Sequence, residues 1–280
     1  MLCQRYNRTD LSPLLPASGT GKDCALFSYC RRKIGALGDG DGRWAVILCP
    51  GGGYEMISPT EGEPVALELV ARGVQTFVLR YSVSPARYPQ QLLELAAAVA
   101  FVRAHREEFG VNRVAVAGFS AGGHLAASLA NLWHSRTLTD TLGGTSALYR
   151  PDAVILGYPV ISTDPEFGCA GCVEKICPPP IPEKLSLERS VTAQNPPAFL
   201  WCTVDDPMVP MENTLSYAGA LRRAGVPFEA HLFQHGPHAM ATATADSAFD
   251  ESGVNAHAAH WVTLCTEWLK ALEPDARFIS

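Results

Sequence analysis

A serine between two glycines stands where an apolar run meets a helix-forming run. Residues 114–119, Val-Ala-Val-Ala-Gly-Phe, are typical of a buried strand, and Ala- and Leu-rich residues follow Ser120. In this context Gly-Phe-Ser-Ala-Gly at 118–122 predicts a nucleophile elbow, a sharp turn that holds a reactive serine in a strained backbone. Its glycines lack Cβ atoms, so strand and helix can approach closely. The same pattern also occurs in ordinary turns, so Ser120 needs chemical partners elsewhere in the chain.

A serine nucleophile needs a base that takes its proton. His235 and His238 both follow the apolar run 228–233 near the C-terminal end of the chain. We favour His238, because His235 stands close to the strand end, whereas the Gly236-Pro237 turn can carry His238 over the edge of a sheet. The other histidines fall in predicted helices or within a strand, where packing or surface roles are expected.

The group that orients the base is expected on the loop after the preceding strand, residues 198–204. Asp205 and Asp206 both stand there, and the residues alone leave the choice between them open. An acidic pair at a strand end is also typical of a solvated turn. The chain order Ser, Asp, His differs from the orders in the chymotrypsin and subtilisin types of serine protease.

Donors for a negatively charged oxygen are expected in Pro-Gly-Gly-Gly-Tyr at 50–54, directly after the apolar run 44–49. Glycines let backbone N–H groups turn inward and let a substrate approach without Cβ contact. The amide of Ala121, directly after the serine, would be the partner donor. A flexible glycine turn is the alternative interpretation. Phosphate binding is disfavoured, because no Gly-Lys-Ser/Thr follows.

Strand-like and helix-like stretches alternate along the whole chain, which predicts an α/β fold with a mostly parallel sheet covered by helices on both faces. We predict one domain over residues 1–280, with a loosely held arm at 1–23 and an irregular Cys/Pro-rich insertion at 162–190. Thr60-x-x-Glu63 resembles a helix capping box. Ligands of such sheets bind beyond the carboxyl ends of the strands, where all the candidate loops lie.

Composition narrows the class of protein. The 280 residues are 47% hydrophobic and carry a net charge of −6, without a basic run that would suggest nucleic acid. The N-terminus lacks the apolar region of a signal peptide, and no run approaches the roughly 18 apolar residues of a spanning helix. The nine cysteines are odd in number and partly in apolar runs, which favours reduced thiols. We expect a cytoplasmic protein without membrane or nucleic-acid partners; the oligomeric state stays open.

Three cysteines, Cys169, Cys172 and Cys177, gather in the predicted insertion. A C-x-x-C pair with a third thiol could hold zinc or an iron–sulfur cluster. No fourth ligand is evident, and the spacing is not that of a known closed site. We therefore predict no metal.

These motifs together resemble the α/β-hydrolase superfamily, and within it bacterial esterases and lipases described as acetyl esterases or acetyl xylan esterases. The resemblance covers the chain from about residue 24 and rests on residues 50–54, 80–83, 118–124, 195–199, 205–210 and 236–238. It implies an α/β-hydrolase fold. Some of these relatives carry a sizeable N-terminal cap, and the 23 leading residues are too few to build one, so we expect no large cap domain. Relatives of the hormone-sensitive-lipase kind usually carry His-Gly-Gly-Gly, and Pro50 replaces that histidine here.

The resemblance implies roles for single residues. Ser120 would be the nucleophile, and His238 the general base and then the general acid. Asp206 is implied over Asp205, because the family's acid stands three residues before the valine of its D-x-x-V-P pattern, here Val209.

The remaining implied roles belong to the glycine turn and the elbow. Gly52, Gly53 and Ala121 correspond to the oxyanion donors, and Tyr54 is a candidate substrate contact.

The implied function is a serine carboxylesterase that hydrolyses short-chain acyl esters, acetyl esters first, on small molecules or oligosaccharides and without a cofactor. Two alternatives stay open. A serine peptidase of the prolyl-oligopeptidase type shares a similar Asp-Asp loop but normally carries a propeller domain. A non-catalytic binding protein with a hydrolase fold usually lacks one member of the triad, and none is missing here.

Overall fold

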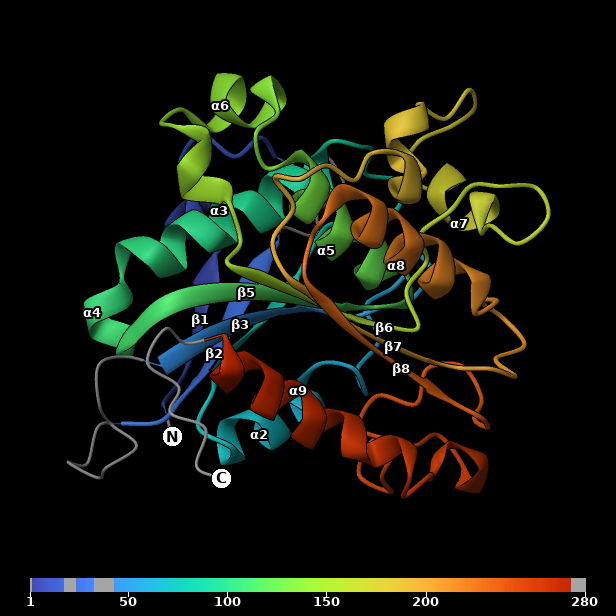
Figure 1. Cartoon of the computed structure of the whole chain (residues 1–280). Coiled ribbons are helices and arrows are strands. Elements are labelled where there is room, and N and C mark those ends of the chain that lie inside the picture. Colours follow the sequence, from blue (N-terminus) through green and yellow to red (C-terminus); the bar gives the residue numbers. More distant parts are fainter. Residues whose placement is uncertain (1, 18–23, 33–42, 273–280) are drawn as a thin grey trace.

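One eight-stranded sheet organises the protein. The computed structural model describes residues 2–17, 24–32 and 43–272 (Figure 1). The strands, in chain order, are β1 (Leu2–Asn7), β2 (Ala25–Cys30), β3 (Arg43–Cys49), β4 (Gln75–Arg80), β5 (Val111–Phe119), β6 (Ala153–Gly157), β7 (Ala198–Thr203) and β8 (Phe228–Phe233).

The spatial order of the strands is β1-β2-β4-β3-β5-β6-β7-β8. β2 pairs antiparallel with β1 and β4, and all pairs from β4 through β8 are parallel. The central strands are continuous apolar runs because both faces of the sheet are covered, and every residue of β3 is buried. The carboxyl ends of β3, β5, β7 and β8 therefore meet along one edge of the sheet.

Helices cover both faces of the sheet, as predicted. The helices of the described residues are α1 (Arg8–Leu11), α2 (Glu63–Ala71), α3 (Gln90–Ala104), α4 (Arg106–Phe109), α5 (Ser120–Leu132), α6 (Arg136–Leu142), α7 (Ala170–Glu174), α8 (Glu212–Ala224) and α9 (Trp261–Ala271). α3, α5 and α8 lie on one face, and α2 and α9 on the other (Figure 1). In these ranges no large cap domain stands over the sheet, and no helix is long and apolar enough to cross a membrane.

Two expectations about the N-terminal half are wrong. Much of the predicted loose arm is structured, since β1 adds an edge strand to β2 and α1 follows it. The capping box at Thr60 does not form: α2 begins at Glu63 after Gly62, without a side-chain cap. The physical reason is Glu61, whose buried side chain accepts a hydrogen bond from Gly51 N–H and keeps this stretch out of the helix.

Candidate active site

Ser120 sits at the junction of β5 and α5 with a strained backbone. Its φ is 52°, in the left-handed region that a serine rarely adopts. A Cβ on Gly118 would lie 2.0 Å from the carbonyl oxygen of Gly122, and a Cβ on Gly122 would lie 2.0 Å from the carbonyl oxygen of Cys49. Both glycines are therefore required by close backbone packing, as the elbow pattern predicts.

The structure brings Ser120, His238 and Asp206 into one hydrogen-bonded chain. His238 Nε2 lies 2.8 Å from Ser120 Oγ, and His238 Nδ1 lies 2.7 Å from Asp206 Oδ2. Because a carboxylate only accepts, Nδ1 carries the proton and donates it to Asp206. Nε2 then presents its lone pair to the Ser120 hydroxyl. This is the tautomer that a base for Ser120 needs.

The second oxygen of Asp206 is also engaged. Asp206 Oδ1 accepts the backbone N–H groups of Met208, at 2.8 Å, and Val209, at 3.0 Å. Its side chain is fully buried, at 0% exposure. The carboxylate is therefore fixed in one orientation, with Oδ2 aimed at His238.

Asp205 forms a separate pair with the other candidate histidine. Its Oδ2 lies 2.8 Å from His235 Nδ1, and its Oδ1 accepts the N–H of Gly236 at 2.8 Å. The hydrogen bond from His235 and then that from Gly236 lower the pKa of Asp205. The side chains of Asp205 and His235 are 51% and 70% exposed. This surface pair ties the β8 loop to the β7 loop and does not contact Ser120.

The glycine turn after β3 lies beside the serine. A Cβ on Gly51 would lie 2.9 Å from Ser120 Cβ. Gly52 and Gly53 have φ values of 116° and 63°, which other residues adopt only with strain. Within the described ranges no hydrogen-bond partner is found for the N–H of Gly52 or Gly53. Ala121 is in the first turn of α5, where N–H groups lack partners within the helix.

Tyr54 is buried and faces inward. Only 1% of Tyr54 is exposed, and its hydroxyl lies 2.9 Å from His124 Nδ1. His124 Nε2 donates to the carbonyl of Leu185 at 2.9 Å, so Nδ1 accepts from Tyr54. Burial lowers the pKa of His124 to about 4, which keeps the ring neutral. The structure thus gives Tyr54 a supporting role behind the glycine turn, and substrate contact by Tyr54 stays a prediction.

Two residues that the sequence analysis missed hold the loop that carries His238. Tyr158 follows β6 with φ 35°, and its hydroxyl accepts the N–H of Ala241 at 2.9 Å. Trp261 Nε1 donates to the carbonyl of Ala241 at 2.9 Å. The only hint in the sequence is an aromatic residue directly after a strand end, which is too common to predict such a contact.

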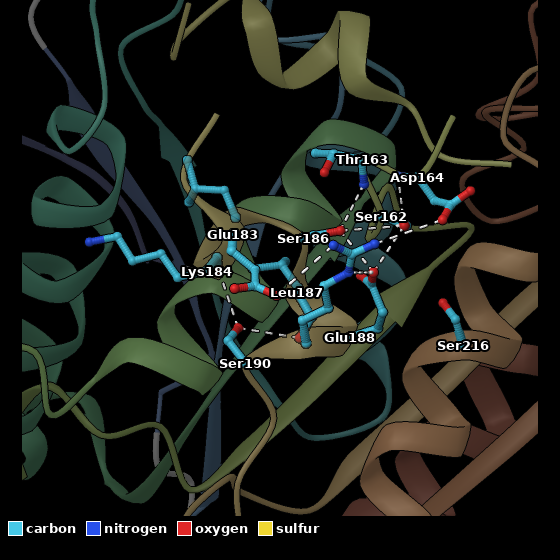
Figure 2. A network of polar contacts seen from close by, with 12 residues as sticks. Ser162, Thr163, Asp164, Glu183, Lys184, Ser186, Leu187, Glu188, Ser190 and Ser216 are labelled. Carbon is cyan, nitrogen blue, oxygen red and sulfur yellow. Dashed lines mark hydrogen bonds and ion pairs between the residues drawn. The ribbon is translucent and has the colours of Figure 1, made fainter. Parts of the chain in front are cut away.

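The segment 162–190 is irregular but firmly held. Glu188 accepts the hydroxyls of Ser162, at 3.1 Å, and Ser186, at 2.8 Å, and Figure 2 shows these side chains gathered between the two ends of the segment. Asn131 of α5 donates to the carbonyl of Leu187 at 2.8 Å. The segment is therefore anchored to the helix that begins with the candidate nucleophile.

The cysteines of this segment are free thiols, like the other cysteines. Burial raises the pKa of Cys172 to about 12, and burial together with the charge of Asp206 raises the pKa of Cys169. Among the described residues no three His, Cys, Asp or Glu side chains gather closely enough to hold a metal ion.

Comparison with known proteins places this geometry in a family. A profile of the α/β-hydrolase fold matches residues 46–171. The acetyl ester-xyloside bifunctional hydrolase from Caldicellulosiruptor lactoaceticus is 33% identical, with a TM-score of 0.79 over 95% of this chain and 93% of that one. A carboxylesterase from Lactobacillus plantarum is 28% identical, with a TM-score of 0.81 over 97% of this chain and 98% of that one.

Curated relatives are longer proteins. Endo-1,4-beta-xylanase B of Butyrivibrio fibrisolvens is 35% identical over 78% of this chain and 35% of its own length. The acetylxylan esterase of Xylanibacter ruminicola is 28% identical over 71% of this chain and 42% of its own length. The chain therefore spans less than half of either protein. With the elbow, the sheet order and these matches in agreement, the chain belongs to the α/β-hydrolase family, among relatives that are esterases.

Proposed function

We propose that this chain is a serine carboxylesterase that removes short acyl groups, acetyl groups first, from the hydroxyls of sugars and other small alcohols. The observation that carries the proposal is the chain of hydrogen bonds from Ser120 through His238 to Asp206, at 2.8 and 2.7 Å. Nucleophile and base lie within hydrogen-bond reach, and a buried carboxylate orients the base.

The proposed reaction has two steps. Ser120 Oγ attacks the ester carbonyl while His238 Nε2 takes its proton, and the negative oxygen forms against the N–H groups of Gly52, Gly53 and Ala121. His238 then gives the proton to the leaving alcohol, which leaves an acyl-serine. Water repeats the cycle: His238 takes its proton, the acid is released, and Ser120 recovers its hydrogen. The residues supply every proton transfer themselves, and no cofactor is needed.

Two observations support a short acyl group and a sugar ester. The side chains of Val160, Val173 and Leu185 belong to one apolar cluster near the serine and are at most 2% exposed. This cluster therefore offers little apolar surface to a long acyl chain. Val160 is adjacent to the nucleophile, because its N–H donates to the carbonyl of Ser120 at 3.0 Å. Relatives whose names include acetylxylan esterase and acetyl ester-xyloside hydrolase support an acetylated sugar.

The test is hydrolysis of a p-nitrophenyl ester series from acetate to decanoate, with acetylated xylan beside it. We expect the highest kcat/KM for acetate and release of acetate from xylan. Ser120→Ala is expected to abolish turnover and labelling by a fluorophosphonate probe while its melting temperature stays near that of the parent. Turnover retained in Ser120→Ala would refute the assignment. Faster cleavage of matched amides would favour a peptidase, and no labelling of the parent protein would favour a binding protein.

The organisation of the chain as one domain and a cytoplasmic location stay predictions. The single sheet of the described residues supports the first. A limited proteolysis experiment that releases a stable fragment smaller than residues 43–272 would contradict it.

A further inference from the structure

We infer that Glu61 is a positioning carboxylate that joins the oxyanion turn to the loop of the catalytic histidine. The inference rests on the proposed esterase function. It assigns a task to a residue that the triad mechanism leaves without one.

Glu61 is buried in the loop before α2 and makes two hydrogen bonds to distant parts of the chain. It is 1% exposed. Its Oε2 accepts the N–H of Gly51 at 2.6 Å, and its Oε1 accepts the hydroxyl of Tyr158 at 2.8 Å. Gly51 opens the oxyanion turn, and Tyr158 ends the strand next to the elbow. One carboxylate thus connects two strand ends that flank the nucleophile.

The direction of these hydrogen bonds favours the ionised form of Glu61. The Tyr158 hydroxyl accepts the N–H of Ala241 at 2.9 Å, so its own proton goes to Glu61. Both carboxylate oxygens therefore act as acceptors, as an anion requires. Burial raises the pKa of Glu61, and the hydrogen bonds from Tyr158 and Gly51 oppose that rise. The carboxylate is held as a charge that protonates more easily than that of an exposed glutamate.

The link reaches the catalytic histidine from two directions. Tyr158 packs edge-on against the imidazole, with ring centroids 5.1 Å apart. The same hydroxyl fixes Ala241, three residues after His238. A shift of Glu61 would therefore move the oxyanion turn and the histidine loop together.

Glu61 and His238 share Tyr158 as a neighbour. His238 contacts the carboxylate of Asp206 on its Nδ1 side and the ring of Tyr158. Glu61 faces Tyr158 and Tyr81, both of which stay neutral because burial raises the pKa of each hydroxyl. Glu61 makes no hydrogen bond to His238 and acts on it through Tyr158 and the loop at Ala241.

The experiment uses Glu61→Gln with Glu63→Gln as the matched control. Glutamine keeps the size of Glu61 but has one acceptor oxygen for two donors, so either the Gly51 N–H or the Tyr158 O–H loses its acceptor. Glu63 carries the same charge two residues away and is exposed. We expect Glu61→Gln to lower kcat on p-nitrophenyl acetate about 10- to 100-fold with little change in KM, since a misplaced turn and base weaken the transition state. Glu63→Gln is expected to match the parent.

A second variant tests the link through Tyr158 by itself. Tyr158→Phe keeps the carboxylate of Glu61 and removes the hydroxyl that donates to it. It should lower kcat on p-nitrophenyl acetate with little change in KM, because the loop at Ala241 loses the same anchor.

Several results would overturn the inference. One is a Glu61→Gln enzyme with parental kcat. Another is a loss explained wholly by a smaller active fraction, counted by fluorophosphonate labelling, with parental kcat per labelled site. If Glu61→Gln does not fold, Tyr158→Phe decides, and parental kcat in that variant also overturns it. Failure of the proposed function is distinguishable, because Ser120→Ala would then keep the parental turnover.

Discussion

Exchanging Asp206 for asparagine tests the assignment of the triad acid most sharply. Asp206→Asn keeps the size and shape of the side chain and removes its charge. Asp206 Oδ1 accepts two backbone N–H groups, from Met208 and Val209. An asparagine must keep its oxygen at that position, because its NH₂ group would otherwise face two donors. The NH₂ group therefore faces His238.

The consequence for catalysis follows from the hydrogen atoms. The NH₂ group of the asparagine donates to His238 Nδ1, which can then no longer carry the imidazole proton. The proton moves to Nε2, and Ser120 meets an N–H instead of a lone pair. The matching exchange in a serine protease lowers kcat about 10⁴-fold, since the wrong tautomer predominates. At about 1.36 kcal/mol for each factor of ten, the expected loss is about 5 kcal/mol of transition-state stabilisation.

The control is the neighbouring acid. Asp205→Asn keeps an oxygen for Gly236 N–H and loses only a half-exposed charge opposite His235. We expect less than about a 10-fold change in kcat, because an exposed ion pair contributes little free energy and this one does not contact Ser120. The assay is initial-rate hydrolysis of p-nitrophenyl acetate, with thermal melts to show that both variants fold. A larger loss from Asp205→Asn than from Asp206→Asn would refute the geometric reasoning and move the role to Asp205.

Three further predictions concern packing, pH and metals. Gly122→Ala is expected to lose more than about 4 kcal/mol of folding free energy in urea titrations, because its Cβ would lie 2.0 Å from the carbonyl oxygen of Cys49. The control is Gly171→Ala, which has open space around its Cβ and should be neutral or slightly stabilising. The pKa of His124 falls from 6.5 to about 4 on folding, so between these pH values the unfolded chain binds a proton at His124 and the folded chain does not. The free energy of unfolding should therefore be unaffected by His124 above pH 6.5 and fall by on the order of 3 kcal/mol as the pH drops toward 4. His124→Gln should remove that part of the pH dependence. Elemental analysis of the purified protein is expected to find no stoichiometric metal, and a chelator should leave ester hydrolysis unchanged; bound zinc or iron would contradict this.

The grouping of the three proposed triad residues was predictable because the fold places strand ends together. Ser120, Asp206 and His238 each follow an apolar run, and parallel strands bring such positions to one edge. The chain order of the three residues and the spacing around Ser120 carried the remaining information. Choosing between Asp205 and Asp206 depended on the resemblance, since nothing in two adjacent carboxylates says which one turns inward.

The supporting residues were not predictable, because their contacts join distant parts of the chain. Glu61 and Tyr158 are 97 positions apart. Glu61 stands in a stretch that resembles a helix cap, and this local pattern predicted the wrong role for its neighbour Thr60. β1 escaped prediction for a related reason: as an edge strand it is mostly exposed, so the apolar alternation of a half-buried strand is missing.

The two neighbouring Asp–His pairs have the same chemical groups but differ in solvent exposure, and we assign them different roles for that reason. Asp206 and His238 are buried and aligned with the serine, whereas Asp205 and His235 stand in solvent and hold the loop. The loop is fixed on both sides of His238, because Asp205 accepts the N–H of Gly236 before it and Tyr158 accepts the N–H of Ala241 after it. A base fixed in this way is aligned before any ester binds, which costs no reorganisation during the reaction. The enzyme we propose therefore needs no closing cap to assemble its triad, and pre-steady-state acylation should show no lag on rapid mixing with substrate.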